Sequence, residues 1–242
     1  IDKPIIQYAV EEAISAGIET LIFVTGKNKR AIEDHFDTNI ELENSLLSKG
    51  MSEQYHKIKN IIPENIQCIF VRQSIQLGLG HAILCAARAV GDEPFAVLLA
   101  DDLMIQKKSL PIKDLIDIYL QEGTSTISVA EVNKGATKKY GIIKPVKRKI
   151  YEKYYISELI EKPDPHQAPS NLASFGRYVF NSEIFDILAK LKPGINNEIQ
   201  LADAINIMAK NGKVLAYEFR GERFDCGDKL GFVEATLHFA MK

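Results

Sequence analysis

The sequence lacks any long hydrophobic segment. No uninterrupted apolar stretch in its 242 residues approaches the roughly 20 residues that a membrane-spanning helix needs. The first residues, IDKPIIQYAV, also lack the basic start and the small-residue cleavage site of a signal peptide. We therefore expect no membrane partner and a cytoplasmic location.

Cysteine and excess positive charge are also scarce. The three cysteines, Cys68, Cys85 and Cys226, are odd in number and widely spaced, which argues against a disulfide framework and against a CxxC metal site. The formal net charge is −2, whereas nucleic-acid binders concentrate Lys and Arg far beyond parity. We expect reduced thiols and no nucleic-acid partner.

Several common catalytic motifs are absent. The stretch TGKNKR (25–30) does not satisfy the P-loop pattern, and VRQSIQLGLGHA (71–82) is only a partial glycine motif rather than GxGxxG. There is no GxSxG elbow and no HExxH pair, and the five histidines are dispersed. Hydrolytic triads and zinc chemistry therefore have no support in the sequence.

What is present is a chain long enough for a full core, with 46% apolar and 26% charged residues. Short apolar or β-branched runs at 20–25, 66–71 and 95–100 each follow a segment with helical periodicity. This alternation is typical of a parallel sheet covered by helices. We predict an α/β, Rossmann-like fold with a mixed, mostly parallel central sheet and helices on both faces.

The second part of the chain changes character. Four strand-like runs, at 125–132, 141–146, 154–163 and 172–180, follow one another with few helices between them, which predicts a smaller antiparallel extension. Helical patterns return at 182–191, 197–212 and 229–242, and the polar stretch 39–60 is predicted as a helical insertion. Because no long Pro/Gly/Ser hinge occurs, we predict a single domain over 1–242.

Two adjacent carboxylates, Asp101 and Asp102, follow the apolar run FAVLLA. In open α/β sheets, ligands gather outside the carboxyl ends of the strands. Hard oxygen ligands at such a crevice suit Mg²⁺, which is commonly held by one or two carboxylates and substrate phosphates. The alternative is that either acid caps a turn or a helix. Asp225 stands in a similar place, between a predicted strand and a Gly-containing turn, and the same alternatives apply to it.

Other residues could contact a nucleotide or a sugar phosphate. Gly78 and Gly80 lie between a strand and a helix, where a missing Cβ lets a ligand approach the backbone. Glu161 could accept hydrogen bonds from sugar hydroxyls, and Lys162 could neutralise a phosphate. Strand alternation would send these two side chains to opposite faces, so a shared role requires a local bend, while Pro163 restricts Lys162 to extended conformations. On chemistry alone, the interpretation of both as surface ion-pair residues is favoured.

The order and spacing of several stretches resemble a known family. They are DKPIIQYAVEEAISAGI, FVRQSIQLGLGHAILCA, PFAVLLADD, YGIIKP, IEKPDPHQAPSNLASFGRYVF, NEIQLADAI and FDCGDKLGFVEA. Together they resemble bacterial UTP–glucose-1-phosphate uridylyltransferases, within the sugar-phosphate nucleotidyltransferases. The resemblance covers nearly the whole chain, and RQ followed by GLGHA, with EIQLADAI and DCGDKLG at these separations, is its most specific part.

The resemblance implies roles for particular residues. Gln73 and Gly78 match positions that contact the uracil and let the nucleoside lie against the backbone. Asp101 and Asp225 match the two metal-binding acids, and Asp102 would support them without touching the metal. The sugar and its phosphate would be bound by Gly141, Glu161, Lys162, Asn171 and Gly176.

The chain departs from this family at its front. Members carry a strand and a glycine-rich loop of the form GxGTRxxPxTKxxPKExLP just before DKP, and this loop binds the triphosphate. The sequence begins at Ile1 without it, and we expect that it precedes Ile1 in the natural protein.

The resemblance implies an enzyme that forms UDP-glucose and pyrophosphate from UTP and glucose 1-phosphate by Mg²⁺-dependent in-line displacement, working as a homo-oligomer. In such a reaction Asp101, Asp225 and Lys162 offset charge on the reacting phosphates. One alternative is a thymidylyltransferase of the same fold that uses dTTP, although the insertion at 39–60 and the GLGHA stretch favour UTP. The other alternative is a non-catalytic protein that binds a nucleotide sugar.

Overall fold

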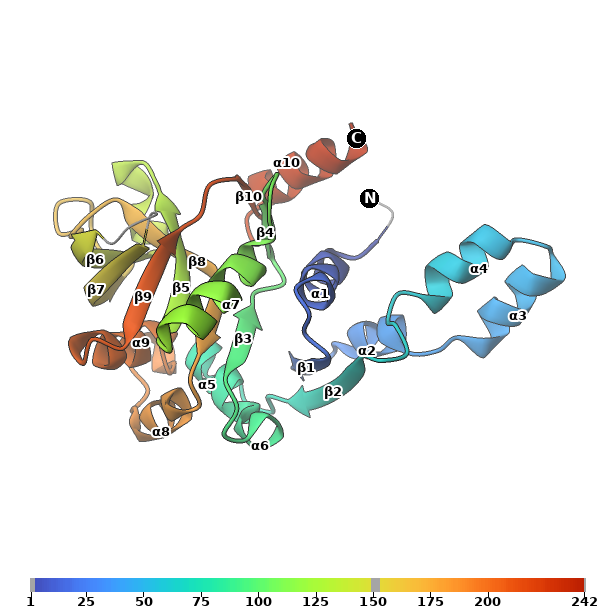
Figure 1. Ribbon diagram of the computed structural model, residues 1–242, viewed down its shortest axis with the longest axis horizontal. Coiled ribbons are helices and arrows are strands. Elements are labelled where there is room, and N and C mark those ends of the chain that lie inside the picture. The colour runs from blue at the N-terminus through green and yellow to red at the C-terminus, as the bar shows by residue number, and fades with distance from the viewer. Residues whose placement is uncertain (1–2, 149–152, 242) are drawn as a thin grey trace.

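The computed structural model describes residues 3–148 and 153–241. Its elements lie in three sheets with helices around them (Figure 1). Among these residues, no helix combines the length and the apolar content needed to cross a bilayer.

The first part of the chain builds a small parallel sheet with its own helices. Strand β1 (Thr20–Thr25) pairs in parallel with β2 (Gln67–Arg72). Apolar residues of α1 (Ile5–Ser15) and α2 (Arg30–Phe36) pack on these strands around Phe23. The predicted insertion is a pair of helices, α3 (Ile40–Ser48) and α4 (Ser52–Lys59), which extends away from the body (Figure 1).

The largest sheet has six strands in the order β3-β8-β5-β9-β7-β6. Its strands are β3 (Phe95–Leu98), β5 (Ser125–Glu131), β6 (Gly141–Arg148), β7 (Lys153–Glu161), β8 (Leu172–Phe180) and β9 (Val214–Glu218). A third, two-stranded sheet pairs β4 (Asp102–Ile105) antiparallel with β10 (Glu222–Asp225).

The prediction of a mostly parallel sheet was wrong for the strands that the structure describes. Among the pairings, β1–β2 and β5–β9 are parallel, whereas β3–β8, β7–β9 and β4–β10 are antiparallel. The pairs β5–β8, β6–β7 and β6–β8 are also antiparallel, as predicted for the extension. The cause is the position of β8, which lies between β3 and β5. Both β3 and β5 are hydrogen-bonded to β8, which runs in the direction opposite to theirs.

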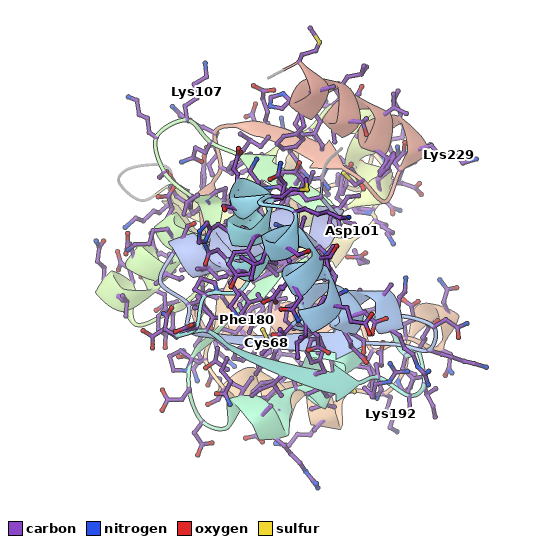
Figure 2. The ribbon with its side chains drawn as sticks, turned by 90° about the vertical axis from the view of Figure 1, so that its right-hand side faces the viewer. Cys68, Asp101, Lys107, Phe180, Lys192 and Lys229 are labelled. Carbon is purple, nitrogen blue, oxygen red and sulfur yellow. The ribbon has the colours of Figure 1, made fainter. Side chains whose placement is uncertain are left out.

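Helices cover both faces of the six-stranded sheet. Side chains alternate along β8, so Tyr178 and Phe180 lie in the main core, while Val179 lies in a second cluster with α7 on the opposite face. The main core includes buried residues of α5 (Gly78–Cys85), α8 (Glu183–Lys190) and α9 (Leu201–Lys210), and the second cluster includes those of α7 (Pro111–Glu122). Figure 2 labels Phe180 within the body, whereas Lys107, Lys192 and Lys229 are at its edge.

The remaining elements are short or terminal. They are α6 (Ala87–Val90), the 3-10 helices η1 (Lys134–Lys139) and η2 (Ile195–Asn197), and α10 (Lys229–Ala240). Gly212 follows the end of α9 with φ +69°, as expected of a residue that terminates a helix in the left-handed region.

Candidate functional site

Asp101 and Asp102 lie at the junction between β3 and β4, but in different environments. Asp101 is exposed in the turn, whereas Asp102 begins β4 and is only 5% exposed. One oxygen of Asp102, Oδ2, accepts a hydrogen bond of 2.9 Å from the backbone N–H of Gly176. Only Asp101 therefore faces solvent, where a phosphate or a metal ion can reach it.

The antiparallel pairing of β10 with β4 brings Asp225 to the same place. Asp225 is the register partner of Asp102, and the next residue, Cys226, donates its N–H to the carbonyl oxygen of Asp101 at 2.7 Å. A Cβ atom placed on Gly227 would lie 3.2 Å from Asp101 Oδ2 and 3.3 Å from Asp225 Oδ1. The two oxygens can be no further apart than the sum of these distances, so the carboxylates converge.

Two residues that the sequence did not single out complete this end of the site. Arg223 lies between Asp102 and Asp225, and the hydroxyl of Tyr140 contacts both Arg223 and Asp225. One signal for Arg223 was available, because a residue two positions before Asp225 on a strand points to the same face. Tyr140 had no such signal, since it comes from a distant part of the chain.

The charges around this cluster act on Arg223 and Cys226. Burial alone would lower the pKa of Arg223, but the Asp102 carboxylate and its hydrogen bond outweigh burial, and the pKa is raised. Burial raises the pKa of the Cys226 thiol, and Asp225 and Asp101 raise it further. Arg223 is therefore a permanent cation, and Cys226 stays a thiol rather than a reactive thiolate.

The donors present suit a magnesium ion bound mainly by its substrate. In the part of the chain that the structure describes, no group of three or more His, Cys, Asp or Glu side chains is arranged to hold a metal. The protein can offer two converging carboxylates, Asp101 and Asp225. Two hard oxygen ligands are what Mg²⁺ commonly takes from a protein when phosphate oxygens and waters supply the rest.

Gly176 is part of the support of this cluster. A Cβ atom on Gly176 would lie 2.8 Å from Leu99 Cβ and 2.9 Å from both Cβ and Oδ2 of Asp102. Only glycine lets β8 approach the turn after β3 this closely. The predicted contact of Gly176 with the sugar stays a prediction.

Gly141, Glu161 and Lys162 meet where β6 begins and β7 ends. Gly141 pairs with Glu161 in the sheet, and a Cβ on Gly141 would lie 3.2 Å from Glu161 Oε2. Lys162 Nζ lies 3.5 Å from Glu161 Oε1, so the structure brings these side chains together. Their roles toward a sugar phosphate stay predictions.

The expected extended conformation of Lys162 was wrong. Lys162 has φ +48°, a left-handed conformation that is unusual for a residue before proline. Its N–H donates to the carbonyl oxygen of Tyr140 at 3.0 Å, and this turn is the local bend that a shared role of Glu161 and Lys162 requires. Since the Tyr140 side chain contacts Asp225, this residue also connects the Glu161 region to the carboxylate cluster.

Gln73 and Gly78 form another part of the candidate site. Gln73 Nε2 donates to the carbonyl oxygen of Gly78 at 3.1 Å and lies 2.9 Å from His81 Nδ1. A Cβ on Gly78, which has φ +86°, would lie 2.8 Å from Glu198 Cβ, and one on Gly80 would lie 2.6 Å from the carbonyl oxygen of Ile199. Both glycines are therefore required for packing, a reason that the sequence did not reveal, and the contact with uracil stays a prediction.

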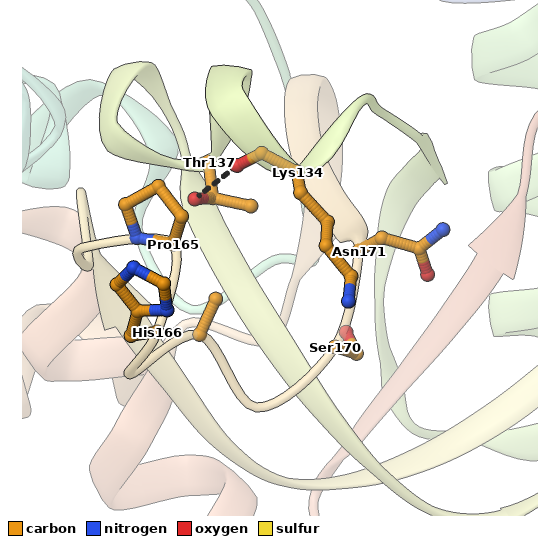
Figure 3. A pocket seen from close by; sticks show the side chains of 7 residues that line it. Lys134, Thr137, Pro165, His166, Ser170 and Asn171 are labelled. Carbon is orange, nitrogen blue, oxygen red and sulfur yellow. Dashed lines mark hydrogen bonds between the residues drawn. The ribbon is translucent and has the colours of Figure 1, made fainter.

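Asn171 lines an open cavity of about 550 Å³ beside η1 (Figure 3). Its backbone carbonyl accepts from Val132 N–H at 2.9 Å. Two hydroxyls of this cavity already donate to the backbone, Thr137 Oγ1 to Lys134 O at 2.9 Å and Ser170 Oγ to Ile143 O at 2.6 Å. The sugar contact predicted for Asn171 stays a prediction.

A larger apolar groove of about 770 Å³ lies between the first sheet and β3. Its lining includes Phe23 of β1, Leu79 of α5 and Leu98 of β3, and it reaches Asp101.

Carboxylates, a lysine and a glutamine lie at strand ends of this α/β protein. Ligands of open α/β sheets bind at such strand ends, and these side chains are typical of the class of proteins that binds nucleotides and other phosphate compounds. A sequence model described as nucleotidyl transferase matches residues 1–241. The chain belongs to this nucleotidyl transferase family, as the resemblance in its sequence implied.

Curated relatives match the chain over its whole length. The UTP–glucose-1-phosphate uridylyltransferase 2 of Staphylococcus saprophyticus is 50% identical over 100% of this chain and 83% of its own length. A UTP–glucose-1-phosphate uridylyltransferase of Staphylococcus epidermidis is 49% identical with the same coverage.

Solved structures share the fold. An apo UDP-glucose pyrophosphorylase has a TM-score of 0.94 at 43% identity and is matched over 100% of this chain and 88% of its own. The UTP-bound enzyme of Acinetobacter baumannii has a TM-score of 0.90 at 38% identity, over 99% of this chain and 83% of its own. These matches confirm an α/β nucleotidyltransferase fold for the chain.

Proposed function

We propose that this protein transfers a uridylyl group from UTP to glucose 1-phosphate and releases pyrophosphate. The observation that carries the proposal is the match, at about half identity and over the whole chain, to proteins named for this reaction. The converging carboxylates of Asp101 and Asp225 support it, because two hard oxygen ligands suit a magnesium ion that also binds phosphates.

The proposed site residues act on the phosphates and on the sugar mainly through their charges. Asp101 and Asp225 would hold Mg²⁺, which would supply positive charge to the phosphates. Lys162 offsets the charge of the sugar phosphate, and Glu161 beside it accepts hydrogen bonds from sugar hydroxyls. The phosphate oxygen of glucose 1-phosphate attacks the α-phosphorus of UTP, and pyrophosphate leaves from the opposite side. Positioning and electrostatics suffice, and no covalent intermediate forms.

Nucleotide recognition is assigned to the residues at and before the start of α5. Gln73, held by Gly78 and His81, would present its amide to the uracil edge. Gly141, Asn171 and Gly176 complete the proposed sugar pocket. The single domain, the homo-oligomeric state and the cytoplasmic location also stay predictions.

The test is pyrophosphate release by the intact protein with UTP and glucose 1-phosphate, with Mg²⁺ and with EDTA. We expect Mg²⁺-dependent release with UTP and much slower release with dTTP. Faster turnover of dTTP would identify a thymidylyltransferase instead. Binding of UDP-glucose without any turnover would leave the non-catalytic alternative.

A further inference from the structure

Arg223 has no part in the chemistry proposed above, yet it is the cation among the carboxylates at the strand ends. Its side chain is 17% exposed. It comes from β10, while Asp102 comes from β4 and Tyr140 precedes β6. Arg223 therefore connects elements that are far apart in the sequence.

Each nitrogen of the guanidinium group has a different neighbour. Nε lies 2.5 Å from Asp102 Oδ1, Nη1 donates to the Tyr140 hydroxyl at 3.1 Å, and Nη2 donates to Asp225 Oδ2 at 3.5 Å. The Tyr140 hydroxyl in turn donates to Asp225 Oδ2 at 3.3 Å. One oxygen of Asp225 is thus held from two directions.

The position of the guanidinium is itself fixed. Its Cζ lies 4.0 Å from the centroid of the Phe175 ring and 4.9 Å from that of Tyr140, and the partner carboxylate of Asp102 is buried and bonded to Gly176 N–H. A planar group with donors on three sides can bridge such neighbours, whereas the single ammonium of lysine cannot. The guanidinium is therefore placed by an ion pair with Asp102 and by the rings of Phe175 and Tyr140.

The other oxygen of Asp225 points to the candidate metal position. Oδ1 accepts from Gly227 N–H at 3.2 Å and lies on the side of Asp101 Oδ2. If Oδ2 were released, rotation of the carboxylate would move Oδ1 away from Asp101. Contacts of this kind, outside the ligands themselves, orient metal-binding side chains and are costly to remove.

We propose that Arg223 is a positioning residue that, anchored on Asp102 and assisted by Tyr140, orients Asp225 toward Asp101 for metal binding. The inference rests on the metal-binding role of Asp225 in the proposed function. It also explains why two acids follow β3. Asp101 faces the ligand, whereas Asp102 pairs with Arg223, and Arg223 in turn orients Asp225 toward Asp101.

The first test is Arg223→Gln in the intact protein. Binding of Mn²⁺ alone is measured by electron paramagnetic resonance, and kcat and KM are measured with Mg²⁺. We expect Mn²⁺ affinity and kcat each to fall about 10-fold or more. KM for glucose 1-phosphate should stay near the wild-type value, because the proposed sugar contacts Glu161 and Lys162 lie at the end of β7.

A second variant separates positioning from stability. Arg223→Gln leaves Asp102 buried without its cation, so the fold itself can suffer. Asp102→Asn combined with Arg223→Gln removes that charge, and the asparagine oxygen can still accept from Gly176 N–H. We expect the double variant to regain thermal stability while its Mn²⁺ affinity and kcat stay low. Recovery of Mn²⁺ affinity together with stability would show that Arg223 is only structural.

The matched control is Glu222→Gln on the same strand. Glu222 pairs with His238 of α10 at 3.1 Å, and we expect its loss to leave Mn²⁺ binding unchanged. If the wild type releases pyrophosphate but Arg223→Gln binds Mn²⁺ as tightly as the wild type, the positioning role of Arg223 is wrong while the proposed function stands. If the wild type binds Mn²⁺ without catalysing the transfer, the proposed function fails, and the Mn²⁺ titrations still decide the role of Arg223.

Discussion

Asp101 and Asp102 are neighbours in the chain with the same side chain, yet their surroundings give them different tasks. The turn after β3 exposes Asp101, while the start of β4 buries Asp102 against Gly176 and Arg223. A buried carboxylate is tolerated only when it is paired and hydrogen-bonded. Substituting either acid should therefore affect different properties of the protein.

For Asp101→Asn, we expect a loss of catalysis without a loss of stability. The exposed side chain contributes little to packing, but its charge is proposed to hold the metal ion, so kcat should fall about 100-fold or more. Pyrophosphate release and thermal unfolding measure the two effects. Asp92→Asn, which changes another exposed acid, is the control and should leave both unchanged. Normal turnover of Asp101→Asn would return this residue to the turn-capping alternative.

Residue types and spacing could predict which acids are candidate metal ligands, but not which side chains contact them. Strand-end position identified Asp101 and Asp225 as candidates, and the structure brings them together. The cation between Asp102 and Asp225 depends on the pairing of β4 with β10, two strands more than 100 positions apart. The bend at Lys162 was missed because the rule for residues before proline concerns local sterics, while the bond to Tyr140 O stabilises the exception.

At the scale of elements, one buried ion pair joins α1, β8 and α7. The Glu12 carboxylate accepts from Arg177 Nη2 at 2.7 Å and from Ile112 N–H at 3.0 Å. Arg177 is 1% exposed, and its Nη1 also donates to Leu99 O and Gly176 O. The pair thus holds the first helix onto the end of β3, next to Asp101.

Removing one partner of this pair should be strongly destabilising. We expect Arg177→Met to lower the free energy of unfolding by about 3–5 kcal/mol, because Glu12 is left as an uncompensated buried charge. Combining it with Glu12→Leu should recover part of the loss. Urea unfolding measures both variants, with Lys113→Gln as the control for an exposed ion pair, expected to change stability by less than about 1 kcal/mol. A small effect of Arg177→Met would mean that water reaches this site.

The elements themselves could be predicted closely, because their signals are local. Periodicity placed β1 at 20–25 and β8 at 172–180, as found. Their order in the sheets could not be predicted, since β8 enters between β3 and β5 through long-range pairing. The glycines of α5 show the same limit, because Glu198 and Ile199, which require them, are more than 100 residues away.

At the scale of the whole molecule, the three sheets are held around a core in which polar groups are few. Buried polar or charged residues include Ser125, Thr126, Ser128 and Arg177. Tyr178 places a phenol in the main core, with its ring stacked on that of Phe180 at 5.6 Å between centroids. An ionisable group in such a place couples the stability of the fold to pH.

Burial raises the pKa of Tyr178 to about 12, and the nearby charges of Asp102 and Glu161 add to this effect, while Arg223 opposes it. An unfolded tyrosine loses its proton near pH 10. The pKa of Tyr178 is therefore higher in the folded protein than in the unfolded chain. The protonated phenol stabilises the fold fully below pH 10, and this contribution to the free energy of unfolding is lost as the pH rises from about 10 to 12. We expect Tyr178 to reduce the free energy of unfolding by about 1.4 kcal/mol between pH 9 and pH 11.

Urea unfolding of the wild type and of Tyr178→Phe at pH 9, 10 and 11 measures this contribution. The two proteins share every other side chain, so the difference between them isolates Tyr178. We expect the wild type to lose stability relative to Tyr178→Phe as the pH rises, because only the wild type must keep a proton on a buried phenol. A difference that stays constant over this range would mean that the phenol is as accessible to water in the folded protein as in the unfolded chain, which its position in the main core argues against.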